Sequence, residues 1–175
     1  LISSRAELSY EGQSTTTELA GVTAGYDTMR SLTVTEGEFI SADHVLGRAA
    51  VAVLGPTTAD NLFGQHEGVA GRSVRVNGQA FRVIGILKAQ GGSGFSNADD
   101  QVIVPLTTAQ SRLVSRRTVR SAVDMILVQA ASAQQVAAAQ DEAASVLRSR
   151  HQTPVGADDF TIFTQQNFLD IAGTI

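Results

Sequence analysis

The stretch SVRVNGQAFRVIGIL, residues 73–87, determines the local fold because two alternating segments flank an Asn-Gly pair. Asn77 and Gly78 in this setting are typical of a two-residue type I′ turn, which joins antiparallel strands. The turn predicts a register in which Val76 pairs with Gln79 and Val74 with Phe81. We therefore expect a hairpin with one buried face, formed by Val74, Val76, Phe81 and Val83, and one solvated face, formed by Arg75, Ala80 and Arg82.

The segments on either side of this hairpin predict further strands and helices. AAVAVLGPTTADNLFG, residues 49–64, has the pattern of a buried strand followed by a short helix, with Pro56 in the first turn and Gly64 at the C-terminal cap. DDQVIVPL, residues 99–106, predicts one more strand. TTAQSRLV then predicts a helix with Thr107 as N-cap and Gln110 completing a capping box.

The two ends of the chain each have a strand, helix and strand pattern. Residues 1–48 contain the strand-like AELSY and TTTELAGVT, a helical YDTMRSL and the extended TVTEGEFI. Residues 118–175 contain DMILVQA (124–130), a helix that begins at a Ser132–Gln135 capping box, DFTIFTQ (159–165) and a last helix after Thr164. The apolar stripe expected on the first of these helices consists of Val136, Ala139, Ala143, Val146 and Leu147. We predict an α+β fold with a β-rich insertion.

Composition excludes several classes of protein. The chain has 175 residues, of which 43% are hydrophobic, so it can bury a core. Its formal net charge of −4 and its aromatic content of 5% argue against a nucleic-acid binder. It has no cysteine, which excludes disulfides and thiolate catalysis. Its apolar runs are shorter than the roughly 20 residues that a membrane span needs.

The Gly-rich stretch GGSGF, residues 91–95, is the first candidate for chemistry. A nucleophile elbow needs a second glycine where Phe95 stands and a helix afterwards, and a phosphate loop needs a lysine after the glycines. We therefore predict no catalytic, cofactor or metal site here. We expect instead a surface loop that contacts a partner through Gly91, Gly92, Ser93, Gly94 and Phe95, with Phe95 either packed on the hairpin or standing out as an anchor. Asp99 and Asp100 are predicted to be its solvated end.

Two other groups of residues, the histidines and a basic cluster, are candidates for binding. The three histidines, His44, His66 and His151, are widely separated and show no metal-ligand spacing. The basic cluster RLVSRRTVR, residues 112–120, would place Arg112, Arg116 and Arg120 on one helical face. It is either a contact for lipid headgroups or an acidic partner, or a solvated connector; the second interpretation is favoured.

Several stretches together resemble the extracytoplasmic core domain of MacB-like ABC-transporter permeases. GVTAGYDTMRSLTVTEGEFIS is similar to the N-terminal part of that domain, with Gly21–Tyr26 and Glu36–Ile40 as the matching stretches. Residues 49–64, 71–87 and 91–113 are similar to its middle part. VDMILVQA and DDFTIFTQQNFLD complete the resemblance, which extends over essentially the whole chain.

The resemblance implies an extracytoplasmic domain at the periplasmic face of the bacterial cytoplasmic membrane, between two transmembrane helices, with Leu1 after the first and Ile175 before the second. It implies a porter-like lobe, residues 1–48 and 118–175, and an inserted β-rich, sabre-like lobe, residues 49–117. The implied function is to transmit ATP-driven motion for export or efflux. The ATPase would lie in a separate cytoplasmic domain or chain.

The partners that the resemblance implies are the membrane helices, the ATPase, a second permease copy and a periplasmic adaptor protein. No nucleic acid and no cofactor is expected, and the isolated domain is predicted to be a monomer because its few aromatic residues offer few interface anchors. The alternative functions are a cargo-binding module for lipoprotein or peptide release and a regulator of a cell-envelope enzyme. A free-standing hydrolase has no support in the sequence.

Overall fold

The computed structural model describes residues 1–91, 98–114, 122–164 and 167, and its contacts divide the chain into two units, Leu1–Leu127 and Val128–Ile175. Unit 1 contains one seven-stranded sheet. The strands are β1 (Ile2–Tyr10), β2 (Gln13–Val22), β3 (Val34–Gly37), β4 (Val51–Leu54), β5 (Ser73–Val76), β6 (Gln79–Leu87) and β7 (Gln101–Pro105). Within the described residues, no helix has the length and apolar character that crossing a bilayer requires.

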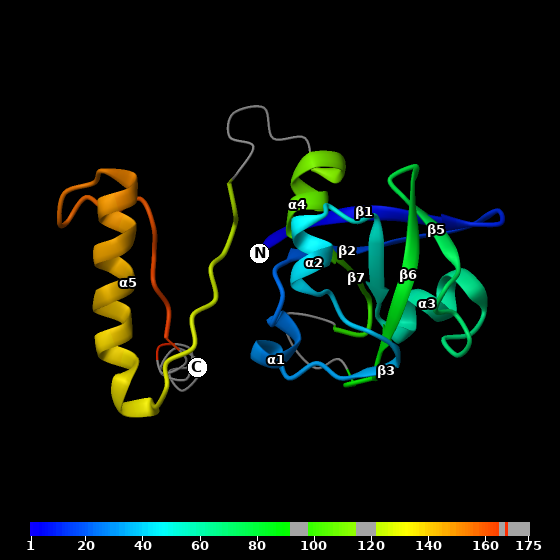
Figure 1. Cartoon of the computed structure of the whole chain (residues 1–175), viewed down its shortest axis with the longest axis horizontal. Helices are drawn as coiled ribbons and strands as arrows, with labels where there is room; N and C mark the ends of the chain where they lie inside the picture. The colour runs from blue at the N-terminus through cyan, green and yellow to red at the C-terminus, as the bar shows by residue number, and fades with distance from the viewer. Residues whose placement is uncertain (92–97, 115–121, 165–166, 168–175) are drawn as a thin grey trace, which may run out of the picture. The chain divides into compact units, whose positions relative to one another are not determined.

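The sheet closes on itself. Its strand order is β3-β6-β4-β7-β2-β1-β5, and β5 also pairs with β6, so all strands but β3 form a ring (Figure 1). The β2–β7 and β4–β6 pairs are parallel, and the other pairs are antiparallel. In a closed ring each strand has a neighbour on both sides, so none of the six ring strands is an edge strand.

The Asn77-Gly78 hairpin is confirmed. Both residues have positive φ angles, 47° and 79°, as a type I′ turn requires. Val76 pairs with Gln79 and Val74 with Phe81, in the predicted register. The predicted faces are also confirmed: the valines and Phe81 are buried, while Arg75, Ala80 and Arg82 are exposed.

Two apolar clusters lie on the two faces of the sheet. The inner cluster draws side chains from every strand of the ring, including Leu8, Leu19, Leu54, Val74, Phe81 and Val102. The outer cluster lies over adjacent strands β2, β7, β4 and β6 and includes Val22, Val53, Ile84 and Ile103. Strands β4 and β7 are therefore buried on both faces, which explains their unbroken apolar sequences.

Short helices cover the sheet. They are α1 (Tyr26–Arg30), α2 (Ala42–Leu46), α3 (Pro56–Phe63), α4 (Leu106–Thr108) and the π-helical η1 (Ala109–Leu113). Helix α3 begins with Pro56 and ends at Gly64 in the left-handed conformation, as predicted. The capping box predicted at Thr107 is wrong, because α4 already begins at Leu106 and the Thr107 hydroxyl donates to the Val45 carbonyl oxygen instead.

Unit 2 contains the 3₁₀ helix η2 (Ala133–Gln135) and helix α5 (Val136–His151). Near the end of α5, Arg148 makes two 2.7 Å contacts with Asp158. This ion pair lowers the pKa of Asp158 and raises that of Arg148. Ser132 precedes η2 without a side-chain cap, so the predicted capping box is wrong. Ala144 is the buried residue of α5, and Ala139, Ala143 and Leu147 of the predicted stripe are half-buried, while Val136 and Val146 are exposed, so the stripe is confirmed only in part.

Two predicted strands in the last third of the chain are absent from the described structure. Residues 124–130 and 159–164 belong to no helix or strand, and the backbone bends at Asp124, Asp159 and Phe160. The helix predicted after Thr164 falls on residues that lie, except for Asn167, outside the described part of the chain.

The α+β class is confirmed, but the two units do not coincide with the predicted division of the chain. Strands β1 and β2, from residues 1–48, pair within the same ring as strands from residues 49–117. The boundary marked by the contacts lies between Leu127 and Val128. The assignment of porter-like and sabre-like lobes stays a prediction.

Candidate partner-contact site

The predicted partner-contact loop is described at its base. Gly91 is exposed and has a φ angle of 72°. Gly92, Ser93, Gly94 and Phe95 lie outside the described residues, and so do both predicted roles of Phe95. The description resumes at Ala98, so the two ends of the loop can be compared.

The side chain of Asp99 joins these two ends. Its Oδ1 atom accepts a hydrogen bond from the backbone N–H of Gln90 at 2.8 Å, and its Oδ2 atom accepts from Gly91 at 2.9 Å. Asp99 is only 9% exposed, so the prediction that it forms a solvated end is wrong. A carboxylate that accepts two backbone hydrogen bonds is a strong local clamp.

The backbone of Asp99 also caps a helix. Its carbonyl oxygen accepts hydrogen bonds from the N–H groups of Thr57 at 2.9 Å and Thr58 at 3.4 Å, in the first turn of α3. These donors have no partner inside the helix, and the N-cap residue Gly55 has no side chain to offer them. Asp99 therefore ties the loop to α3 as well as closing it.

Asp100 forms a second anchor. Its Oδ1 atom lies 2.9 Å from the Thr17 hydroxyl and 3.0 Å from the Thr58 hydroxyl, and the two hydroxyl oxygens are 3.1 Å apart. Both threonines are buried, so these bonds satisfy groups that water does not reach. Asp100 thus links β7 to β2 and α3 and is not the solvated residue predicted.

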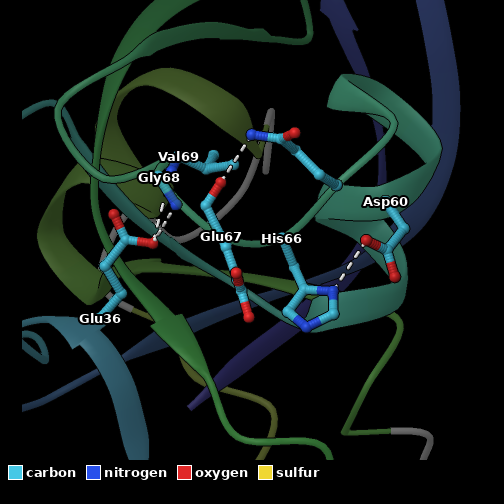
Figure 2. Close-up of polar contacts among 7 residues, drawn as sticks. Glu36, Asp60, His66, Glu67, Gly68 and Val69 are labelled. Carbon is cyan, nitrogen blue, oxygen red and sulfur yellow. Dashed lines mark hydrogen bonds and ion pairs between the residues drawn. The ribbon is translucent and has the colours of Figure 1, made fainter.

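A neighbouring loop, residues 64–72, is held by a carboxylate from β3. The Glu36 side chain accepts hydrogen bonds from the backbone N–H groups of Gly68 at 2.8 Å, Val69 at 3.4 Å and Ala70 at 3.0 Å. Figure 2 shows this carboxylate turned toward Gly68 and Val69. Val69 is fully buried in the inner cluster, so the contact fixes the loop to the core.

His66, in the same loop, contacts α3. Its Nδ1 atom lies 2.8 Å from Asp60 Oδ1, and Figure 2 shows the ring facing this carboxylate. The hydrogen bond to Asp60 raises the pKa of His66 above its ordinary value near 6.5. His44 lies instead in the capping box of α2 with Ser41, and His151 contacts Asp159. The structure brings none of the three histidines into a common site among the residues it describes.

The basic cluster is described only in part. Arg112 lies in η1, and its carbonyl oxygen accepts a hydrogen bond from the Gln79 side chain at 3.3 Å. Arg116 and Arg120 lie outside the described residues. The shared arginine face therefore stays a prediction.

The carboxylates of the described site hold loops and helices of the same chain together. Asp99, Asp100 and Glu36 each use their carboxylate oxygens to hold backbone N–H or hydroxyl groups of the same chain. The sequence reasoning missed all three roles. For Asp99 and Asp100 the available signal was their position directly before the buried strand β7, where a carboxylate can cap a neighbouring segment, whereas Glu36 lies within the partly exposed strand β3 and gave no such signal.

Comparison with known proteins supports one family. Residues 1–146 match the family described as the MacB-like periplasmic core domain. A macrolide export ATP-binding/permease protein MacB of Bdellovibrio bacteriovorus is 33% identical over 171 residues, which are 97% of this chain and 25% of that protein. The protein of the same name from Chlorobium luteolum is 32% identical over 161 residues. The chain thus spans about a quarter of the length of these relatives.

Solved structures share the fold. The periplasmic region of MacB from Actinobacillus actinomycetemcomitans superposes with a TM-score of 0.74 at 20% identity, over 99% of this chain and 74% of that one. The extracellular domain of the noncanonic ABC-type transporter YknZ from Gram-positive bacteria gives a TM-score of 0.69 at 23% identity, over 87% of this chain and 74% of that one. At these identities the likeness concerns the fold alone.

Proposed function

We propose a mechanical function on the premise that this chain, by its match over residues 1–146, belongs to the family of MacB-like periplasmic core domains. The domain transmits ATP-driven movement of a permease across the membrane and so drives export or efflux. It works at the periplasmic face of the cytoplasmic membrane, as part of an integral membrane protein. ATP is bound and hydrolysed by a separate cytoplasmic domain or chain.

The closed ring of strands is the observation that carries this proposal. A body that transmits force must move as a whole, and pairing on both sides keeps the strands from sliding apart. The ring is filled by the inner cluster and covered on one side by the outer cluster. Interiors packed to this degree deform little and pass displacement on.

The loop Gly91–Phe95 is proposed as a contact for a partner, such as a periplasmic adaptor protein. Support comes from its base, where Asp99 closes the loop and caps α3. Because the clamp already fixes Gly91 and Asp99, less conformational entropy is lost there when a partner binds.

Residues 118–175 are proposed as part of a porter-like lobe that is completed by chain outside this sequence. Apolar side chains of residues 124–130 and 159–164 are exposed, among them Met125 (51%), Ile126 (61%) and Phe163 (62%). The solved MacB periplasmic region contains further chain, since this sequence covers 74% of it. Strand partners from that further chain would cover these side chains.

The test measures movement in the full-length permease. A single cysteine at exposed Ser14 is spin-labelled in each copy of the permease dimer, and the distance between labels is measured with and without ATP. We expect ATP to change this distance. If ATP is hydrolysed while the distance stays constant, the mechanical function is rejected, and specific retention of a lipopeptide by the domain would then support the cargo-binding alternative.

Two further measurements address the partners. Light scattering on the isolated domain should give the monomer mass at micromolar concentration, because the membrane helices and the ATPase would hold the dimer together. Calorimetry should detect no ATP binding to the isolated domain. A stable domain dimer or micromolar nucleotide affinity would contradict these proposals.

A further inference from the structure

The beginning of β1 is tied to the segment that leads out of unit 1. The Leu1 nitrogen donates to the Met125 carbonyl oxygen at 2.9 Å. The Leu1 carbonyl oxygen accepts from the N–H groups of Asp124 at 3.0 Å and Met125 at 3.3 Å. The Asp124 carboxylate also accepts a hydrogen bond from the backbone N–H of Ser3, two residues further along the chain than Leu1, at 2.9 Å. We call these contacts the clasp.

The clasp is attached to residues that are themselves packed and paired within the ring of strands. Ile2, the first residue of β1, lies between the clasped residues Leu1 and Ser3, is fully buried and pairs with Gly21 of β2. Leu1 packs against the outer cluster. On the other side, Gln110 of η1 donates to the Ala122 carbonyl oxygen at 3.4 Å. Residues 122–125 are thus bound to two elements of unit 1 directly before the boundary at Leu127.

We propose that Asp124 is a positioning residue. By holding residues 122–125 against the start of β1, it makes movement of residues beyond Leu127 act on the ring of strands at this point. This inference rests on the proposed mechanical function. A displacement of Val128 acts through Met125 on Leu1 and Ser3, and from there on the β1–β2 ladder, which runs from Ile2–Gly21 to Tyr10–Gln13. Because β2 also pairs with β7, the displacement reaches the centre of the sheet.

Chain length explains what the clasp contributes. Without it, the described contact of this segment with unit 1 that remains is the 3.4 Å hydrogen bond between Gln110 and Ala122. The stretch from Ala122 to Leu127 can extend to about 17 Å, so it would take up a movement of several ångströms before the ring moved. With the clasp in place, the connection to unit 2 begins after Met125.

The Asp124 carboxylate is the part of the clasp that substitution can remove. A carboxylate that accepts from a backbone N–H forms a charge-assisted hydrogen bond. Asp124→Ala removes this acceptor, whereas Asp124→Asn keeps a side-chain oxygen that can accept from Ser3. The pair of variants separates loss of the bond from a change of side-chain volume or charge.

The experiment uses the full-length permease with its ATPase, spin-labelled in separate samples at Ser14 in unit 1 or at Glu142 in unit 2 of both copies of the dimer. Both positions are exposed, and this part of the permease has no cysteine of its own. The change in the distance between the labels of the two copies on adding ATP is measured by pulsed electron paramagnetic resonance. We expect Asp124→Ala to lose most of the change at Ser14 and to keep the change at Glu142, and Asp124→Asn to retain both.

Asn77→Gly is the matched control. Asn77 Oδ1 accepts from the Glu7 N–H at 2.9 Å, the same kind of bond on the same strand, but far along β1 from the clasp. Glycine removes this acceptor and still permits the positive φ angle. This variant should keep the full ATP-dependent change.

A short Gly-Ser insertion between Leu127 and Val128 adds slack beyond the clasp and leaves unit 1 intact. The insertion should abolish the ATP-dependent change in label distance at Ser14, as Asp124→Ala does. It tests the inference even if Asp124→Ala does not fold. The inference is overturned if the insertion, or folded Asp124→Ala, shows the full change at Ser14. If the unsubstituted protein shows no change between any pair of labels, the proposed function itself has failed.

Discussion

Gly55 and Asp99 pack backbone against backbone: a Cβ atom on residue 55 would lie 2.6 Å from the carbonyl carbon of Asp99. The backbone of Gly55 is extended, with φ −69° and ψ 151°, a conformation that any residue adopts. The glycine is therefore required by the close approach and not by its conformation. This approach places the Asp99 carbonyl oxygen where it caps α3.

Gly55→Ala should destabilise unit 1 by about 1–3 kcal/mol, because the new methyl group forces Asp99 away from α3. Urea unfolding followed by circular dichroism measures the change in free energy. The amides of Thr57 and Thr58 should also exchange faster with solvent, since they lose their acceptor. Unchanged stability together with unchanged exchange would contradict the cap.

Gly64→Asn is the control at the other end of α3. Gly64 has a φ angle of 73°, and a Cβ there would meet nothing within 4 Å. Asparagine tolerates this left-handed conformation better than other residues. We expect a loss well below that of Gly55→Ala, which would separate a conformational requirement from a steric one.

Asp100→Ala should reduce stability by about 1–3 kcal/mol, because it leaves a buried hydroxyl group without its acceptor. Thr17 and Thr58 can still bond to each other, so only one hydroxyl group loses its partner. Asp100→Asn keeps an oxygen at this position and should lose less. Combining Asp100→Ala with both Thr17→Val and Thr58→Val leaves neither of these hydroxyl groups buried without a partner, so the combined variant should lose less stability than the sum of the separate losses.

The sequence predicted the β5–β6 hairpin and the ends of α3 well, and the closure of the sheet and the last third of the chain poorly. The Asn77-Gly78 turn and the Pro56 and Gly64 ends of α3 depend on neighbouring residues only, so their signals are local. The β1–β2 hairpin was missed because its turn, Glu11-Gly12, is a weaker signal than Asn-Gly. The ring depends on the parallel pairs β2–β7 and β4–β6, whose strands are far apart in the sequence.

The base of the predicted partner-contact loop was misjudged, and the contact itself stays a prediction. Two aspartates beside a Gly-rich stretch have the composition of a solvated loop. The side-chain partners of Asp100 are Thr17 and Thr58, which precede it by 83 and 42 residues. No periodicity or spacing connects such positions, so only the three-dimensional fold shows that Asp100 is an anchor.

Glu36→Ala should release the loop 64–72. The substitution removes the acceptor of the Gly68, Val69 and Ala70 amides, and Val69 is buried, so we expect a loss of about 1–3 kcal/mol. Hydrogen exchange should accelerate at these amides more than in the β5–β6 hairpin. Glu36→Gln keeps one acceptor oxygen and should give an intermediate result. Equal exchange in all variants would argue against this anchor.

The His66–Asp60 contact should depend on pH. The bond to Asp60 raises the pKa of His66 in the folded state, so protonation favours folding. The contribution is fully present below the unfolded pKa near 6.5 and is lost as pH rises through the higher folded value. Nuclear magnetic resonance titration of the ring should show this higher pKa, and Asp60→Asn should lower it. Because the pair is exposed, high salt should also weaken it.

Shortening the partner-contact loop should spare the fold and weaken partner binding. The clamp atoms belong to Gln90, Gly91 and Asp99, so a short Gly-Ser link in place of residues 92–97 leaves every clamp bond available. Halving the loop length changes the closure free energy by only about 0.6 kcal/mol. Ser93→Ala, in contrast, should alter neither stability nor transport, because the sequence around it lacks the elements of a nucleophile. Urea unfolding and a transport assay on the full-length permease measure both properties. Loss of transport in folded Ser93→Ala with adaptor binding retained would indicate a catalytic serine and contradict the contact role, whereas full transport and full adaptor binding in the shortened variant would remove the loop from the interface.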